Sequence, residues 1–568
     1  RPLRFLLATR AARRWRFPGW WLTSTAAALR SRIAYGSSLA LPSPPRQAMC
    51  DLARAEADSV RIWHGRKRTV RHASAAGARG SYRRDMTIDE KPVSVRPGEA
   101  RCPGPSTRDI LLGDSVPPPA PILEESYTFR GDDDISYDEF TSAEYAEAEF
   151  DRMWGRVWQW ACREEHIPEP GDYYVYDIGD RSAIVVRGPD GTIRAFHNAC
   201  LHRGTQLKPP ATMGYSPKLR CPFHGWTWST EGDLVDLPCD WDFPHVDAEE
   251  FQLPQLRVGI WGGFVFVNFD DCEEHELAPP LLEYLGDLPR HFDEAGWDLT
   301  DRYIEVHIRK KLPANWKASA AAFLEAYHIL ETHSQSIMTA GDANAQYDVF
   351  GENVSRFVHT IATTSPHVPE AKRPSEEKLL GMLMARKNPG DEVPEIPEGE
   401  RARDVYARHM QKVLGEAYDR DFTGTSIAET IDSIEYFCFP NMFVFPGLQI
   451  PMIYRLRPDG DPRQGGVDQA VYEVLFLRPK PESGKVPEPA VPFDLDVDDS
   501  YTTVPGIPGS LGVVLDQDTS NLAAQTRGFR SSKKRGQTLG NYQEVRARHL
   551  HQTVRAYIEG TERSAVSS

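Results

Sequence analysis

Alternating apolar and polar residues mark the middle of the chain as β-structure. The stretch YYVYDIGDRSAIVVRGPDGTIRAFHNAC, residues 173–200, alternates along most of its length, and Pro-Asp-Gly at 189–191 is typical of a turn between two strands. The run GIWGGFVFVNF, which begins at Gly259, is mostly apolar but shorter than the roughly 18 residues of a membrane span, so it predicts a buried strand pair. We therefore predict a small β domain over residues 159–275 and no membrane-spanning segment.

Helical spacing occurs on both sides of this β domain. Residues 136–158, SYDEFTSAEYAEAEFDRMWGRVW, predict one amphipathic helix that packs on the C-terminal domain over residues 276–560. The apolar side chains expected on its buried face are Phe140, Tyr145, Phe150, Trp154 and Val157. Residues 314–333, ANWKASAAAFLEAYHILETH, are rich in Ala, Leu and Glu, which also favours a helix.

Three polar segments are not expected to form a core of their own. Residues 86–135 contain DSVPPPAPILEE and predict an extended arm, and residues 561–568 predict a short tail. The segment from Thr363 to Arg403 is rich in Pro, Glu and Lys, which predicts a long mobile excursion that could act as a lid over a pocket.

Charge divides the chain into two chemically different parts. Residues 1–85 hold 17 Arg and one Lys against four acidic residues, whereas the whole chain has a net charge of −16. Residues 1–48 have the composition of an organelle transit peptide, but the sequence MTIDEKPVSV at Met86 favours a natural start there, with residues 1–85 as upstream sequence translated in frame. We expect a chain that starts at Met86 to fold. The strongly acidic remainder argues against binding to nucleic acid.

Two Cys-His pairs carry the clearest chemical signal. Cys200 and His202 are two residues apart, and Cys221 and His224 are three apart. Two loops that each supply two soft or borderline ligands are typical of a metal site, and structural zinc is one interpretation. A Rieske cluster needs one Cys and one His from each loop, because two thiolates hold one iron and two imidazoles hold the other. The spacing favours the Rieske interpretation, and the eight cysteines show no disulfide framework, which fits a reducing cytoplasm.

The segments CLHRG and CPFHGW resemble the Rieske signature in the large, or alpha, subunit of bacterial ring-hydroxylating oxygenases. The resemblance extends over roughly residues 136–560. It implies an α+β protein with a small all-β Rieske domain over 159–275 and a helix-grip catalytic domain over 276–560, in which a curved antiparallel sheet surrounds a long helix. It also implies that Cys200 and Cys221 bind one iron, and that His202 and His224 bind the other.

A second part of the resemblance concerns residues 314–333. The segments NWK and FLEAYH, followed by a further His, resemble the mononuclear iron helix of the same family, which implies that His328 and His333 are ligands. On an ideal helix His333 lies about 140° around from His328, so both reach one ion only if the helix ends or widens there. A facial triad also needs a carboxylate, for which Asp518 in VVLDQDTSNLAAQ is the first candidate and Asp516 the alternative.

Glu325 occupies the position of a carboxylate that bridges subunits in this family. The family residue, usually Asp, links a Rieske His of one subunit to an iron-ligating His of its neighbour, and Glu325 is longer by one methylene. Ala321 and Ala322 replace residues that are often polar in the family, so their hydrogen bonds are absent here. The candidate walls of the substrate pocket are Phe323, Tyr347, Phe350, Met442 and Phe443.

The resemblance implies a terminal oxygenase of the bacterial cytoplasm. It would use O2 and a mononuclear Fe(II) to hydroxylate an aromatic or other apolar ring substrate, as a monooxygenase or a dioxygenase. The sequence has no dinucleotide-binding or second ferredoxin motif, so NAD(P)H would act through a separate reductase, with or without a ferredoxin. The family assembly is a homotrimer, with or without a small beta subunit. A Rieske electron carrier and a helix-grip protein that binds a ligand without turnover are the alternatives.

Overall fold

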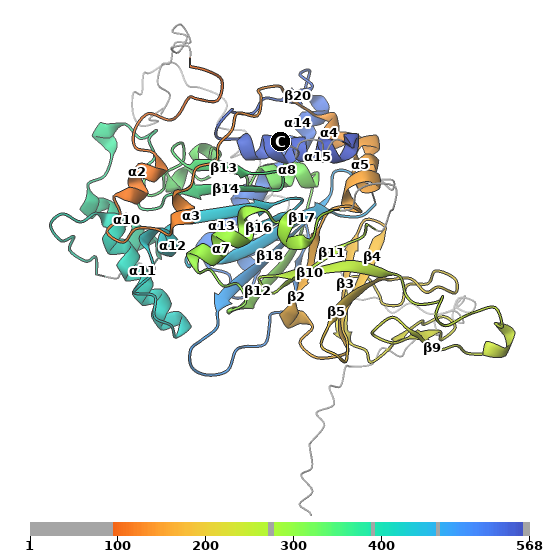
Figure 1. Cartoon of the computed structure of the whole chain (residues 1–568). Coiled ribbons are helices and arrows are strands. Elements are labelled where there is room, and N and C mark those ends of the chain that lie inside the picture. Colours follow the sequence, from red (N-terminus) through yellow and green to blue (C-terminus); the bar gives the residue numbers. More distant parts are fainter. Residues whose placement is uncertain (1–94, 271–277, 388–391, 462–465, 561–568) are drawn as a thin grey trace, which may run out of the picture. The chain divides into compact units, whose positions relative to one another are not determined.

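The computed structural model describes residues 95–270, 278–387, 392–461 and 466–560, which are coloured by sequence in Figure 1. The expectations for residues 1–85 and for the tail at 561–568 lie outside the described residues. All the elements below belong to the unit Lys91–Ser568.

The predicted β domain contains a seven-stranded antiparallel sheet of order β2-β11-β10-β5-β4-β3-β6. The hairpin turn at 189–191 joins β4 to β5, and the apolar run at 259 forms part of the pair β10 and β11, so both strand predictions are confirmed. A three-stranded sheet, β7-β8-β9, holds the second Cys-His segment between β7 and β8. The strands are β2 (Gln159–Arg163), β3 (Asp172–Ile178), β4 (Arg181–Arg187), β5 (Ile193–His197), β6 (Met213–Tyr215), β7 (Leu219–Arg220), β8 (Thr227–Trp228), β9 (Leu234–Asp236), β10 (Gln255–Trp261) and β11 (Phe264–Asn268).

The rest of the chain is built on an eight-stranded sheet of order β13-β14-β15-β16-β17-β18-β12-β19. All neighbours in it are antiparallel except β12 and β19. The C-terminal helix α15 (Val545–Glu559) packs on β13, and its Arg546 pairs with Glu435 of β15 at 2.8 Å. The strands are β12 (Arg302–Leu312), β13 (Gln346–Phe350), β14 (Val354–His359), β15 (Ser433–Cys438), β16 (Met442–Val444), β17 (Met452–Pro458), β18 (Ala470–Pro479) and β19 (Phe493–Leu495). The mixture of sheets and packed helices confirms the α+β class.

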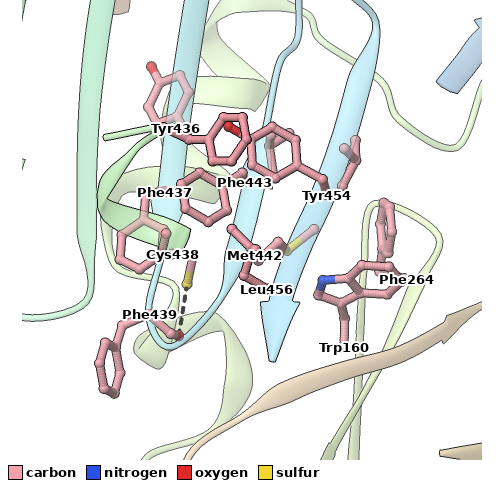
Figure 2. Close-up of a cluster of buried hydrophobic side chains, with 14 of the residues drawn as sticks. Trp160, Phe264, Tyr436, Phe437, Cys438, Phe439, Met442, Phe443, Tyr454 and Leu456 are labelled. Atoms are coloured by element: carbon pink, nitrogen blue, oxygen red, sulfur yellow. Dashed lines mark hydrogen bonds between the residues drawn. The ribbon is translucent and has the colours of Figure 1, made fainter. Parts of the chain in front are cut away.

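The two large sheets share one hydrophobic core. Figure 2 shows Trp160 and Phe264 from the seven-stranded sheet in the same buried cluster as Phe443 and Tyr454 from the eight-stranded sheet. Arg455 of β17 crosses the junction, because its guanidinium lies 3.8 Å from the centre of the Trp160 ring and donates to the Trp160 carbonyl. The β domain is therefore joined to the larger sheet by continuous packing.

The segment 136–158 is not the single helix that its spacing predicts. It forms α4 (Asp138–Thr141), α5 (Ala143–Glu149) and a π-helical turn η2 (Phe150–Trp154). Ser142 interrupts the helix with an extended backbone, and its hydroxyl accepts the N–H of Tyr145 at 3.1 Å, so it caps α5. The expected apolar face is still buried, except that Tyr145 is only half-buried.

Two further expectations need correction. The predicted arm contains α2 (Thr107–Leu112) and α3 (Ala120–Leu123), and its Asp114 forms a buried ion pair with Arg403 at 2.8 Å, so the described part of the arm is folded against the domain. The predicted excursion contains α10 (Glu376–Lys387), which packs on α11 (Ala402–Tyr418). Leu379, Leu380 and Leu383 of α10 are buried in that contact and form its apolar face. The many polar residues around them made the segment look unfolded in the sequence.

The remaining elements surround these sheets. None of the described helices has both the length and the apolar composition needed to cross a membrane. The elements are α6 (Leu281–Tyr284), α7 (Asp287–Ala295), α8 (Trp316–Ala321), α9 (Ile329–Thr332), α12 (Ile427–Ile431), α13 (Gly509–Ser520), α14 (Leu522–Ser531), the strand pair β1 (Ile135–Ser136) and β20 (Gly536–Gln537), and the short helices η3 (Glu164–His166), η4 (Asp240–Asp242), η5 (Ser334–Ser336), η6 (Glu370–Lys372) and η8 (Tyr501–Thr503).

A buried ion pair ties α5 to α8. Glu149 accepts from the ammonium of Lys317 and from the indole N–H of Trp316 at 2.9 Å, and both charged side chains are almost fully buried. We expect Glu149→Ala to lower the free energy of unfolding by about 3–5 kcal/mol, because Lys317 would keep an uncompensated buried charge. Denaturant unfolding compares this variant with Asp151→Ala, which removes an exposed acid nearby. Equal losses in the two variants would contradict the prediction.

Candidate metal centres

The two Cys-His segments form loops with the same backbone pattern. In the first, Cys200 donates its N–H to the carbonyl of the residue five positions later, at 2.9 Å, and Gly204 donates back to the Cys200 carbonyl at 2.9 Å. In the second, Cys221 and Gly225 make the same two bonds, at 2.8 and 3.2 Å. Both glycines have positive φ, +75° and +82°, which side chains larger than Gly rarely adopt. The loops are therefore equivalent halves of one site.

These loops bring the four predicted Rieske residues together. The rings of His202 and His224 lie 4.6 Å apart, and His202 stacks on Trp226. Burial raises the pKa of Cys200, and the neighbouring Cys221 thiol raises it further. Both cysteines are buried, whereas His224 is exposed. The thiols thus face inward and the imidazoles lie toward the surface.

The donor set fits a Rieske cluster. Nδ1 of His202 is buried and has no hydrogen-bond partner among the described residues, as expected of a nitrogen kept for a metal. The N–H of Phe223 donates to the Cys221 sulfur at 3.5 Å, and such bonds stabilise thiolates. Two thiols and two imidazoles in paired loops match the ligand requirement of two unlike irons.

The predicted helix over 314–333 is interrupted. It consists of α8 and α9, with turns and irregular backbone at residues 322–328 between them. Side chains replace the helical bonds in this gap, since Glu325 accepts the N–H of His328 at 2.9 Å and the Tyr347 hydroxyl accepts the N–H of Ala326 at 2.9 Å. Ala321 and Ala322 pack against the core. The break therefore comes before His328, and not only between the two histidines.

This irregular backbone brings His328 and His333 together with Asp518 of α13. Their potential ligand atoms all lie within 4.8 Å of one another, the one such His, Cys, Asp or Glu cluster among the described residues. Asp518 Oδ1 is 2.6 Å from Nε2 of His333 and 3.5 Å from Nε2 of His328. Asp516 lies elsewhere, because its carboxylate accepts the N–H of Tyr501 at 3.0 Å. The structure brings Asp518, and not Asp516, to the two histidines.

Oxygen atoms behind the two imidazoles determine which nitrogen faces the cluster. Nδ1 of His328 is 2.8 Å from Oε1 of Glu325, and Nδ1 of His333 is 2.9 Å from Oε1 of Gln517. Gln335 donates to the same oxygen of Gln517 at 2.8 Å, which fixes the orientation of the amide. Each Nδ1 therefore carries a proton, and each Nε2 is the nitrogen that lies beside Asp518 and that a metal would bind. Gln517 was not predicted, and its position next to Asp518 is the one sequence feature that points to it.

The electrostatics of the cluster favour a cation. Burial lowers the pKa of His328, but the hydrogen bonds that its ring donates to Asp518 and Glu325 outweigh burial, so that the pKa is raised to about 10. The pKa of Asp518 is lowered in spite of burial, because His328 and His333 donate to it. The carboxylates of Asp518 and Glu325 therefore favour positive charge beside His328. Two histidines and one carboxylate on one side of a cavity fit the facial triad of a non-haem Fe(II) site.

The cluster opens on a cavity of about 250 Å³. Phe323 lines this cavity, as predicted. The other four predicted walls, Tyr347, Phe350, Met442 and Phe443, belong to the buried core and do not line it, and Figure 2 shows the last two inside the hydrophobic cluster. The helical excursion contributes Leu383 to the wall, and α11 contributes Tyr406.

Glu435 and His359 are among the polar residues of the cavity wall that were not predicted. Glu435 is buried, and burial raises its pKa to about 7 although Arg546 and Tyr454 bind its carboxylate. His359 is also buried, and burial, together with the charges of His328 and His333, lowers its pKa to about 4. His359 is therefore neutral at pH 7. Each lies alone in an apolar strand sequence, where no local pattern indicates a cavity.

Two family models match the chain over the regions that carry these centres. Residues 157–247 match the Rieske [2Fe-2S] domain, and residues 297–560 match the catalytic domain of the ring-hydroxylating alpha subunit. The chain belongs to the Rieske ring-hydroxylating oxygenase family. Membership confirms the Rieske cluster and the mononuclear iron as its cofactors, and it favours the cluster over structural zinc.

Relatives of this member of the family are similar to it over part of their length. The chlorobenzene dioxygenase alpha subunit of Cupriavidus sp. (strain PS12) is 34% identical over 207 residues, which are 36% of this chain and 44% of the relative. The chain spans less than half the length of the curated relatives that it matches first.

Solved structures show the same fold. A quaternary ammonium Rieske monooxygenase in complex with L-carnitine is 17% identical, with a TM-score of 0.51 over 75% of this chain and 95% of the other. A naphthalene 1,2-dioxygenase variant bound to phenanthrene is 18% identical, with a TM-score of 0.51 over 75% of this chain and 92% of the other.

Proposed function

We propose that this chain is a terminal oxygenase component that hydroxylates an aromatic or other apolar ring substrate. The observation that carries the proposal is the position of His328, His333 and Asp518 on the wall of a largely apolar cavity, in a chain that also holds a Rieske domain. An electron carrier would need only the Rieske domain, and a ligand-binding protein would need neither centre. The oxygenase accounts for both.

The side chains around the cavity have separate tasks in this proposal. When bound, the cluster supplies electrons one at a time, and the mononuclear iron supplies the site at which O2 is activated. Glu325 and Gln517 hold the Nδ1 protons of the two histidines, and Asp518 contributes one negative charge. Apolar residues such as Phe323 and Leu383 exclude water from the cavity and hold the substrate by burial.

Glu325 is the candidate link between subunits. Both of its oxygens bind His328, one at Nδ1 and one at the backbone N–H, and its side chain is only 10% exposed. In Figure 1 the strand β9 of the Rieske domain lies well apart from α8, where the iron segment begins. We infer that His202 or His224 of one subunit approaches Glu325 of the next in a closed head-to-tail ring, with a homotrimer as the expected assembly.

Other partners follow from the same proposal. Electrons would come from NAD(P)H through a separate reductase, with or without a ferredoxin, because the chain shows no dinucleotide-binding motif of its own. The proposed setting is the bacterial cytoplasm, as the relatives are bacterial. A small beta subunit is an alternative feature of the assembly, and the proposed reaction is a monooxygenation or a dioxygenation.

Metal analysis tests the proposed function. We expect about three irons and two labile sulfides in each chain, from one two-iron cluster and one mononuclear site. Two irons with two sulfides would support the electron carrier instead. One zinc without labile sulfide would remove the cluster, and with it the oxygenase.

A further inference from the structure

The wall of the cavity includes a buried histidine, His359, with a ring nitrogen that has no hydrogen-bond partner among the described residues. His359 is the last residue of β14, and its register partner on β15 is Ser433, so the two side chains lie on the same face of the sheet. Both residues line the cavity that also contains His328 and His333. His359 therefore faces the space in which a substrate would lie, from the sheet side of the cavity.

His359 is only 7% exposed, and its Nε2 has no hydrogen-bond partner among the described residues. Buried polar nitrogens are nearly always hydrogen-bonded, because leaving them unpaired loses the interactions that water would provide. The atom is not a fourth ligand, since the ligand cluster among the described residues consists of His328, His333 and Asp518. Because His359 lines the cavity, a molecule bound in the cavity can supply the missing hydrogen bond to Nε2.

Gln449 presents a second unpaired atom to the same cavity. It lies between β16 and β17, and its Oε1 is buried without a hydrogen-bond partner among the described residues. Glu435, by contrast, has a hydrogen bond to each carboxylate oxygen, one from Arg546 and one from Tyr454. The wall away from the iron ligands thus combines two unpaired neutral groups with a balanced ion pair, and apolar side chains such as Ile361 and Leu383 form much of the rest.

We propose that the substrate is a ring compound with an uncharged hydrogen-bonding substituent, a hydroxyl or a group like it, that binds His359 and Gln449. This inference rests on the proposed function and specifies its substrate class. A hydroxyl can donate to the Gln449 oxygen, and it can donate to or accept from a neutral imidazole. A plain hydrocarbon would leave both atoms unpaired, which is how a polar site rejects an apolar analogue.

Binding of 2-naphthol and naphthalene to the anaerobic, iron-loaded protein tests the inference, with the fluorescence of each ligand as the signal. The measured quantity is the ratio of the two dissociation constants. We expect the preference for 2-naphthol to fall on the order of tenfold in His359→Phe, which keeps a flat ring but removes the nitrogens. His359→Gln places an amide near the position of Nε2 and should restore at least part of the preference. Comparing variants cancels the difference in hydration between the ligands.

Matched variants separate this effect from a change of cavity shape. Ile361→Val removes a methyl group from the cavity wall two residues beyond His359 and should change both dissociation constants alike, whereas Gln449→Leu should lower the preference for 2-naphthol. The absorbance of the Rieske cluster shows that each variant is folded. An unchanged ratio in His359→Phe overturns the inference and leaves the oxygenase in place. If neither ligand binds the wild-type protein, the ring substrate of the proposed function fails as well.

Discussion

Replacing His328 or His333 with alanine is expected to abolish product formation and to leave the visible spectrum of the Rieske cluster intact. In the proposed assignment the two centres have separate donor sets, because Cys200, His202, Cys221 and His224 lie in the two loops and none of them belongs to the cluster of His328, His333 and Asp518. Mutating a residue that hydrogen-bonds a metal ligand lowers activity by up to roughly 100-fold. Loss of the imidazole removes the ligand itself, so the loss of activity should be larger. The measurements are product yield, iron content and absorbance.

The reciprocal variant completes this test. His202→Ala should lose the cluster spectrum and keep the mononuclear iron, since His202 lies in the first loop and stacks on Trp226. His409→Ala, on α11 but not in the lining of the cavity, is the matched control and should change neither. A His328 variant that loses the Rieske spectrum would show that the assignment of ligands is wrong.

Glu325→Gln is expected to reduce oxygenation by about 10- to 100-fold while both metals stay bound. Glutamine keeps the size of the side chain and one oxygen acceptor for the Nδ1 proton of His328, but it removes the negative charge beside that imidazole. If electron transfer between subunits is coupled to protonation of His328, the Glu325 carboxylate stabilises the imidazolium that forms. A monomeric form of the protein should be inactive for the same reason.

Single-turnover chemistry separates a relay from a merely structural role of Glu325. Pre-reduced Glu325→Gln protein is mixed with O2 and substrate, and product formation and cluster oxidation are followed together. Slow cluster oxidation with both metals present is the expected result. Glu331→Gln is the control, because Glu331 is an exposed acid on α9 of the same segment. If Glu325→Gln oxidises its cluster at the normal rate, Glu325 only stabilises the turn before α9.

Local spacing predicted the Rieske loops because every determinant lies within a few residues. Cys200 and His202, the turn at Gly204 and the equivalent second loop form through contacts inside each loop. The strand pair at Gly259 and the hairpin turn at 189–191 are local in the same sense. Asp518, nearly 200 residues from the histidines, was selected by resemblance alone, since no spacing rule relates the two segments.

The features that the sequence did not predict depend on contacts between distant segments. The break before His328 needs the hydroxyl of Tyr347, which lies on β13, so helix propensity over 314–333 could not reveal it. Met442 and Phe443 were predicted to line the cavity, but which face of a strand points inward depends on its register with neighbouring strands. His359 was missed for the same reason.

The shared core has a consequence for recombining this protein with its relatives. Trp160 and Phe264 pack in one cluster with Phe443 and Tyr454, and Arg455 reaches across to the Trp160 carbonyl, so the end of the β domain in the sequence is not a boundary in the packing. A chimera that exchanges only residues 159–275 would place foreign side chains of β2 and β11 against the native β16 and β17. Exchanged blocks should therefore follow the packing surface and carry these four strands together, even though more than 170 residues separate β11 from β16 along the chain.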